Sequence, residues 1–186
     1  MKSLCSTLFA VLLPLSTIAF SQSDATPVAP SGAQKSFDTM KNFAGKWQGS
    51  VTVVPKIEEM KDTHMQVTLR VTSRGNALVH EMKEFGTPDD ATRYDHPVTM
   101  FYLDGDRLLL THYCDAGNRP RMVGKVSPDG KTVEFDFLDV AGSTQPGHMN
   151  HAVFTFVDAD HHTEDWTYMM PGDKPLHAHM DLQREK

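Results

Sequence analysis

The segment 98–114 constrains the fold more than any other part of the chain. It contains two runs of leucine, aromatic and β-branched residues, separated by the turn sequence Asp-Gly-Asp at 104–106. An Asp-Gly turn between such runs is a strong β-hairpin signal, because glycine accepts the positive φ that the turn requires. Side chains alternate along a strand, so one face of the second run carries His112 and the other carries Tyr113.

The same two-residue period continues from Lys46 to the end of the chain. Apolar and polar residues alternate in ten short segments, which turn-forming residues separate. This pattern predicts an all-β domain, an antiparallel meander of about ten strands. Closure into a barrel removes the free edges of such a sheet, and an open two-sheet sandwich is the alternative. A barrel of this size encloses more volume than its side chains fill, so we expect an interior cavity.

The N-terminal part is predicted to lie outside this domain. Residues 1–21 combine a positive start, an apolar run and small residues at positions 19 and 21, as in a signal peptide with cleavage before Gln22. The run is too short for a stable membrane span, although a retained N-terminal anchor is the alternative. We therefore expect a periplasmic or secreted protein.

Residues 22–35 are rich in Ser, Ala and Pro and are predicted to form a flexible linker. The barrel domain is then expected to cover residues 36–186. It begins with a short helix capped by Ser36, in which Phe37 and Met40 share one apolar face.

Charge and cysteine content argue against a nucleic-acid-binding protein and against a domain stabilised by internal disulfides. The net charge is -6, with acidic and basic residues interspersed, whereas a nucleic-acid-binding surface needs clustered Lys and Arg. Of the two cysteines, Cys5 lies in the predicted signal peptide. Cys114 alone cannot form an internal disulfide, so the core must stabilise the domain. We expect a monomer or a weak dimer.

The segment 43–49, with sequence Phe-Ala-Gly-Lys-Trp-Gln-Gly, resembles the opening of calycin-type barrels. These are the lipocalins, the fatty-acid-binding proteins and the nitrobindin-like haem proteins. The pattern is most similar to the nitrobindin-like and uncharacterised bacterial lipocalin-like groups, although Val51 stands where the former have another glycine. The resemblance implies that Trp47 packs across the barrel floor and that Gly45 lets the chain turn tightly into the first strand.

We interpret the chain as a barrel that binds a small hydrophobic or amphipathic molecule in its lumen. The resemblance to fatty-acid-binding barrels implies that inward arginine and tyrosine side chains hold a ligand carboxylate, with surface arginines as the alternative. Methionines on the apolar faces suit a loosely defined apolar ligand. The candidate ligand-binding residues are Trp47, Arg70, His112, Tyr113, Arg121 and Trp166.

Histidines provide an alternative function. His177 and His179 project from one strand face, so they can offer two nitrogens to one metal ion. His177, followed after six residues by Arg184, also resembles the run that ligates haem iron in nitrobindin-like proteins. The competing interpretation places both histidines on the solvent face, because Leu176 and Ala178 belong to a better core stripe. No cofactor is predicted, and haem or a divalent metal is the alternative.

Catalysis is not predicted. The chain has no Gly-x-Ser-x-Gly, no phosphate-binding glycine loop and no His-Glu-x-x-His. The adjacent His161 and His162 are expected in a solvated turn. An enzyme built in the lumen around His112 remains the third hypothesis.

Overall fold

The structure is a computed structural model that describes residues 31–58 and 63–186. The predicted signal peptide, 1–21, and residues 22–30 of the predicted linker lie outside the described residues. Within the described part of the chain, no helix is both long and apolar enough to cross a membrane.

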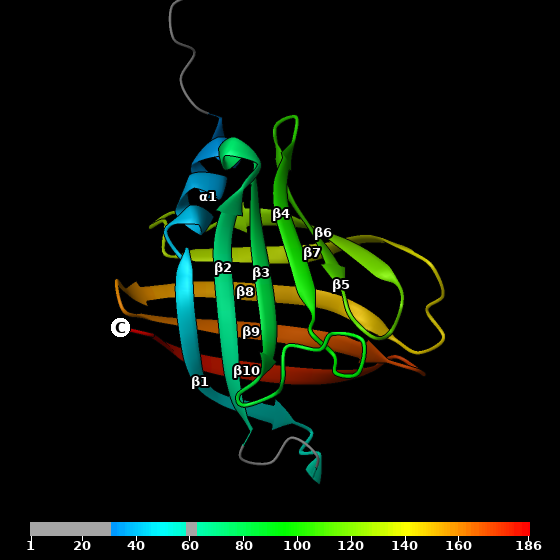
Figure 1. Ribbon diagram of the computed structural model, residues 1–186. Helices are drawn as coiled ribbons and strands as arrows, with labels where there is room; N and C mark the ends of the chain where they lie inside the picture. The colour runs from blue at the N-terminus through cyan, green and yellow to red at the C-terminus, as the bar shows by residue number, and fades with distance from the viewer. Residues whose placement is uncertain (1–30, 59–62) are drawn as a thin grey trace, which may run out of the picture.

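Ten antiparallel strands form a closed barrel, as the alternation predicted (Figure 1). Each strand pairs with the next one along the chain, and β1 closes the barrel by pairing with β10. An open sandwich is therefore excluded. The strands are β1 (Gly45–Val54), β2 (His64–Thr72), β3 (Ala77–Glu84), β4 (Val98–Asp104), β5 (Arg107–Tyr113), β6 (Arg119–Val126), β7 (Thr132–Ala141), β8 (His148–Asp158), β9 (His161–Met170) and β10 (Lys174–Arg184).

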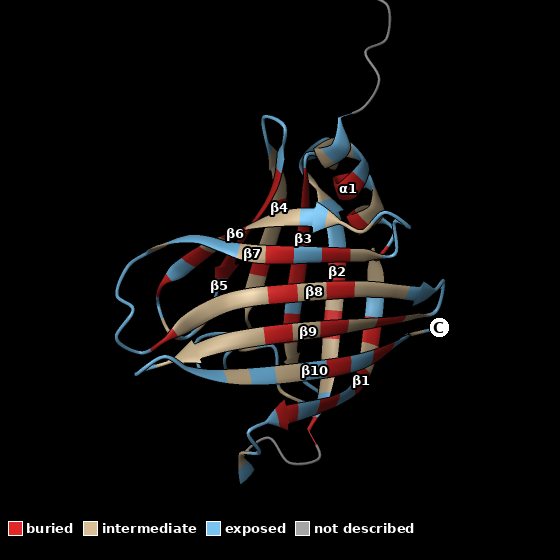
Figure 2. Ribbon diagram, turned by 180° about the vertical axis from the view of Figure 1, so that it is seen from behind, coloured by how far each residue is buried: buried red, intermediate tan, exposed pale blue. Residues whose placement is uncertain are grey.

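Burial alternates along many of the strands, as Figure 2 shows. In β1, Trp47, Val51 and Val53 are buried and the residues between them are more exposed, except for Gly49. The β4–β5 hairpin turns at Gly105, whose φ is 62°. The period that was visible in the sequence thus decides which side chains enter the barrel.

The helix α1 (Gly32–Lys41) lies across one end of the barrel, which we call the capped end (Figure 1). It begins four residues before the predicted cap. The Ser31 hydroxyl caps it by accepting a hydrogen bond from the Gln34 amide at 3.1 Å, whereas the Ser36 hydroxyl donates to the Gly32 carbonyl inside the helix. Phe37 and Met40 are buried, as their spacing predicted.

The sequence Gly-x-Trp-x-Gly closes the capped end. Trp47 is fully buried and donates its indole N–H to the Phe43 carbonyl at 2.8 Å, and the Arg184 guanidinium lies 4.0 Å from the centre of the Trp47 ring. A Cβ atom on Gly49 would lie only 1.7 Å from the Asp181 carbonyl oxygen on β10. Glycine at this position therefore lets β1 and β10 approach each other, which closes the barrel.

Aromatic rings fill the interior beside the capped end. Phe154 packs edge-to-face against Phe101 at 5.4 Å and against Phe135 at 5.9 Å between ring centres, and Phe43 lies 6.4 Å from Phe154. All four phenylalanines are fully buried. Aromatic side chains therefore fill the barrel interior in this half.

Candidate functional site

A cavity of about 340 Å³ lies at the opposite end of the barrel, which we call the open end. Its lining comes from the end of β1, the start of β2, the end of β3 and the adjoining parts of β8, β9 and β10. Four methionine side chains contribute to it: Met65, Met82, Met149 and Met180. Flexible, polarizable thioethers adapt to ligands of different shape, so this wall suits an apolar ligand without a strict outline.

Charged side chains line the rim of the cavity. Lys83 donates to the Thr87 carbonyl at 3.1 Å and forms an ion pair with Asp89, which lowers the pKa of that carboxyl group. Glu84 and Asp95 also line the rim. Because Lys83 already has an acidic partner, the rim is acidic on balance.

A buried polar cluster lies in the barrel interior. It consists of Glu164, His80, His162 and Trp166, none of which is more than 3% exposed. The Nε2 atom of His80 lies 3.0 Å from Oε2 of Glu164, and that of His162 lies 3.0 Å from Oε1. The indole N–H of Trp166 donates to Oε2 at 2.9 Å. The carboxylate is therefore hydrogen-bonded from three sides.

The surroundings of Glu164 keep it ionised. Burial raises the pKa of this carboxyl group, but the charge of His80 and the hydrogen bonds from His162 and His80 outweigh burial and hold the pKa well below its usual range. Each histidine bonds the carboxylate through Nε2, and Nδ1 of each ring is buried with no hydrogen-bond partner among the described residues. The two histidines and the indole thus compensate the burial of this carboxylate.

His112 lies beside this cluster. Its Nδ1 atom shares a hydrogen bond of 2.8 Å with the Thr99 hydroxyl, and its ring centre is 5.5 Å from that of Trp166. Burial, together with the charge of His80, lowers the pKa of His112 to about 4. The imidazole is therefore neutral at pH 7.

Trp166 connects the two features. It lines the cavity, and its ring centre lies 5.7 Å from that of His80 and 5.5 Å from that of Phe154. It also donates to Glu164. The indole thus separates the cavity from the buried carboxylate.

Three of the six candidate ligand-binding residues lie inside the barrel. Trp166 lines the cavity, and His112 is buried behind it. Trp47 lies at the capped end, 4.2 Å from the ring of His162 and on the far side of the polar cluster from the cavity. Only Trp166 is therefore placed to contact a molecule in the cavity.

The other three do not face the cavity, contrary to their expected lumenal position. Arg70 is exposed on the outward face of β2, because Val67 and Leu69 take the inward positions. Arg121 forms a two-pronged ion pair with Asp139 on the outside of the barrel.

Tyr113 is 44% exposed and lines a separate hollow of about 430 Å³ beside the loop 85–97. Cys114 shares this hollow, and burial raises the pKa of its thiol. The hollow lies outside the barrel interior.

His177 and His179 also lie on the outside. His177 shares a hydrogen bond of 3.1 Å with the Thr167 hydroxyl, and His179 lies 2.7 Å from the Asp165 carboxylate. Both are exposed, and Ala178 between them lines the cavity. Both histidines therefore lie on the solvent face, as the competing interpretation expected. His177 does not point toward the interior as a lumenal haem ligand must.

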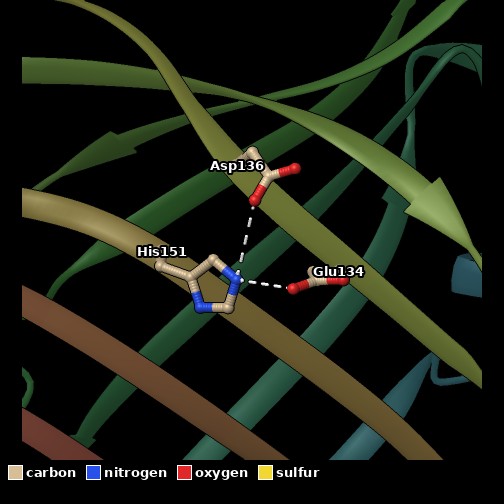
Figure 3. A group of neighbouring side chains, drawn as sticks. All are labelled: Glu134, Asp136 and His151. Carbon is tan, nitrogen blue, oxygen red and sulfur yellow. Dashed lines mark hydrogen bonds and ion pairs between the residues drawn. The ribbon is translucent and has the colours of Figure 1, made fainter.

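Among residues 31–58 and 63–186, one group of three acidic and histidine side chains comes close enough to share a metal ion: Glu134, Asp136 and His151 (Figure 3). The Nε2 atom of His151 lies 3.0 Å from Glu134 and 3.8 Å from Asp136. Lys125 forms an ion pair with the other oxygen of Asp136 at 3.1 Å. These contacts link side chains of neighbouring strands on the outer surface.

Sequence reasoning missed the buried polar cluster. His162 was expected in a solvated turn, but it is fully buried, because β9 begins at His161 and its alternation turns the next residue inward. The available signal was the spacing of His162, Glu164 and Trp166, which places all three on one strand face. His80 was likewise in phase with Leu78 and Met82.

Comparisons with known proteins support the fold alone. No protein-family model matches the chain, and no curated protein matches it in sequence. The crystal structure of Rv2717c from M. tuberculosis is similar, with a TM-score of 0.60 and 12% identity over 81% of this chain and 98% of the other. A protein of unknown function from Nostoc punctiforme, of the DUF3598 family, is 8% identical over 81% of this chain and 99% of its own. Its TM-score of 0.25 is too low to support an argument. The closed ten-stranded antiparallel barrel fits a calycin-like fold.

Proposed function

We propose that the barrel binds a small hydrophobic or amphipathic molecule in the open-end cavity, as a lipocalin-like carrier. The observation that carries this proposal is the methionine-lined cavity of about 340 Å³ in a barrel whose other half is solidly packed. Space is retained at one end while the capped end is filled, and ligand pockets are typically concave and mainly apolar.

The binding energy would come mainly from apolar surface. Removing ligand and wall surface from water contributes roughly 25 cal/mol per Å². The neighbouring strands hold the wall in place, so little is lost in ordering it, whereas the methionine side chains adjust to the ligand. We further propose that the protein acts as a monomer or weak dimer in the periplasm or outside the cell. The features of a signal peptide in residues 1–21 support this location.

A neutral fluorescent probe tests the proposal directly. N-phenylnaphthylamine emits strongly only in apolar surroundings, so it should brighten on addition of the protein, and octanol should displace it. Ala178→Phe places a large ring in the cavity and should abolish the signal. His177→Phe adds a similar ring one residue away on the outward face and should leave binding unchanged.

The variants separate cavity binding from surface adsorption. If Ala178→Phe and His177→Phe bind the probe equally well, the cavity is not the binding site. Optical absorbance of the purified protein tests the haem alternative independently, because a Soret band that Ala178→Phe abolishes would place haem, rather than a small apolar ligand, in this space.

A further inference from the structure

The open-end cavity lacks a cation that is free to hold an anionic ligand. Among the described residues, Lys83 is the only lysine or arginine in its lining, and it is already paired with Asp89. Arg70 and Arg121 lie on the outer face of the barrel. A carboxylate head group would therefore lose its hydration without gaining an ion pair.

The acidic rim borders an aromatic wall. Glu84 and Asp95 lie at the rim, and Glu164 accepts the Trp166 indole N–H behind that wall. A carboxylate that accepts the indole N–H makes the aromatic ring more electron-rich, which strengthens its attraction for a cation. Trp166 and Tyr168 both line the cavity, together with polarizable methionine sulfurs.

We propose that the cavity selects cationic amphiphiles, meaning apolar amines or quaternary ammonium compounds, over carboxylates of equal chain length. This inference rests on the proposed function and specifies the chemistry of its ligand. The alkyl part contacts the methionine wall. The ammonium group lies between the aromatic side chains and the acidic rim, where it keeps part of its hydration.

Three probes that share an octyl chain form the decisive test: octyltrimethylammonium, octanol and octanoate. Each is titrated against the protein in competition with N-phenylnaphthylamine, and intrinsic fluorescence provides a second signal because the chain has only two tryptophans. We expect octyltrimethylammonium to bind at least roughly tenfold more tightly than octanoate, the ratio expected for a partly hydrated cation–π contact of about 1.4 kcal/mol, with octanol between them.

The possible outcomes distinguish a failure of the cation preference from a failure of the proposed carrier function. Tighter binding of octanoate than of octyltrimethylammonium, or equal binding of the two, overturns the cation preference and leaves the carrier function standing. Failure of all three probes and of N-phenylnaphthylamine to bind overturns both.

Variants locate the source of the preference. The double variant Glu84→Gln, Asp95→Asn should lower the ratio of octyltrimethylammonium affinity to octanoate affinity a few-fold. Added salt should also lower this ratio in the wild-type protein. Glu81→Gln, on the outward face of the same strand, is the matched control and should leave the ratio unchanged. Trp166→Phe should weaken octyltrimethylammonium more than octanol. Equal weakening of both by Trp166→Phe would contradict a cation–π contribution.

Discussion

The two halves of the barrel interior share the same strands but are built differently. At the capped end, α1 and the rings around Phe154 leave no space, and the indole of Trp47 closes the floor. At the open end, the same sheet surrounds a cavity with methionine walls. The cluster around Glu164 lies between the two. The contrast suggests that the packed half stabilises the fold, so that the other half can remain open for a ligand.

The largest expected difference between the two ends is the stability lost when an apolar side chain is truncated. Phe154→Ala removes a ring that contacts five other aromatic rings, that of His80 included, and should cost about 4 kcal/mol of unfolding free energy. Met65→Ala, in the cavity wall, should cost about 1 kcal/mol, because Met65 is only half-buried and borders empty space. Urea unfolding of both variants measures the difference. Similar losses would show that the two ends contribute equally to stability.

Breaking the polar cluster should be nearly as damaging. His80→Leu removes one partner of the buried Glu164 carboxylate, which should destabilise the protein by about 3 kcal/mol. His179→Leu removes a histidine–carboxylate contact on the outer surface and should cost less than about 0.5 kcal/mol. Chemical denaturation at pH 7 compares the two, and a mild effect of His80→Leu would mean that Glu164 does not need His80 to remain buried.

Acid should destabilise the protein through His112. Its pKa is about 4 in the folded state, whereas an unfolded histidine titrates near about 6.5. Between these values the unfolded state binds a proton that the folded state does not, so stability falls as the pH falls. The total loss is about 3 kcal/mol. Glu164 adds to it only below its own unfolded pKa of about 4.

Substitution of His112 isolates this contribution. His112→Gln should be less sensitive to pH between about 6.5 and 4 than the wild type. Unfolding free energies measured at several pH values provide the slope. An unchanged slope would assign the acid sensitivity to other groups.

The smallest expected effect concerns added volume. Ala152→Phe, in the packed half, has no space to occupy and should cost about 2 kcal/mol. Ala178→Phe points into the cavity and should change stability by less than about 1 kcal/mol while it blocks probe binding. The midpoint temperatures of thermal unfolding distinguish the two variants. A large loss of stability in Ala178→Phe would mean that the cavity is smaller or more rigid than its geometry indicates.

Much of this architecture was visible in the residues themselves. The turn at 104–106 and the alternation of apolar and polar side chains predicted the strands and their closure, because neighbouring residues determine the period of a strand and its turns. Trp166 was named as a ligand-binding candidate and does line the cavity. The helix was predicted too late in the chain, because Ser31 and Ser36 are both competent caps and local sequence does not choose between them.

The polar cluster could not be assembled from the sequence in the same way. Glu164 and His80 are 84 positions apart, on strands that do not pair with each other. A histidine or glutamate on a half-apolar strand usually faces water, and only a partner across the barrel makes its burial favourable.

By itself the sequence determined the strands, the turns between them and the alternation of side chains along each strand, because these follow from a local two-residue period. The tertiary structure alone decided which end of the barrel is packed, which end is open and which charges meet inside. Those depend on contacts between residues far apart in the chain, whose free energy exists only once the barrel has closed.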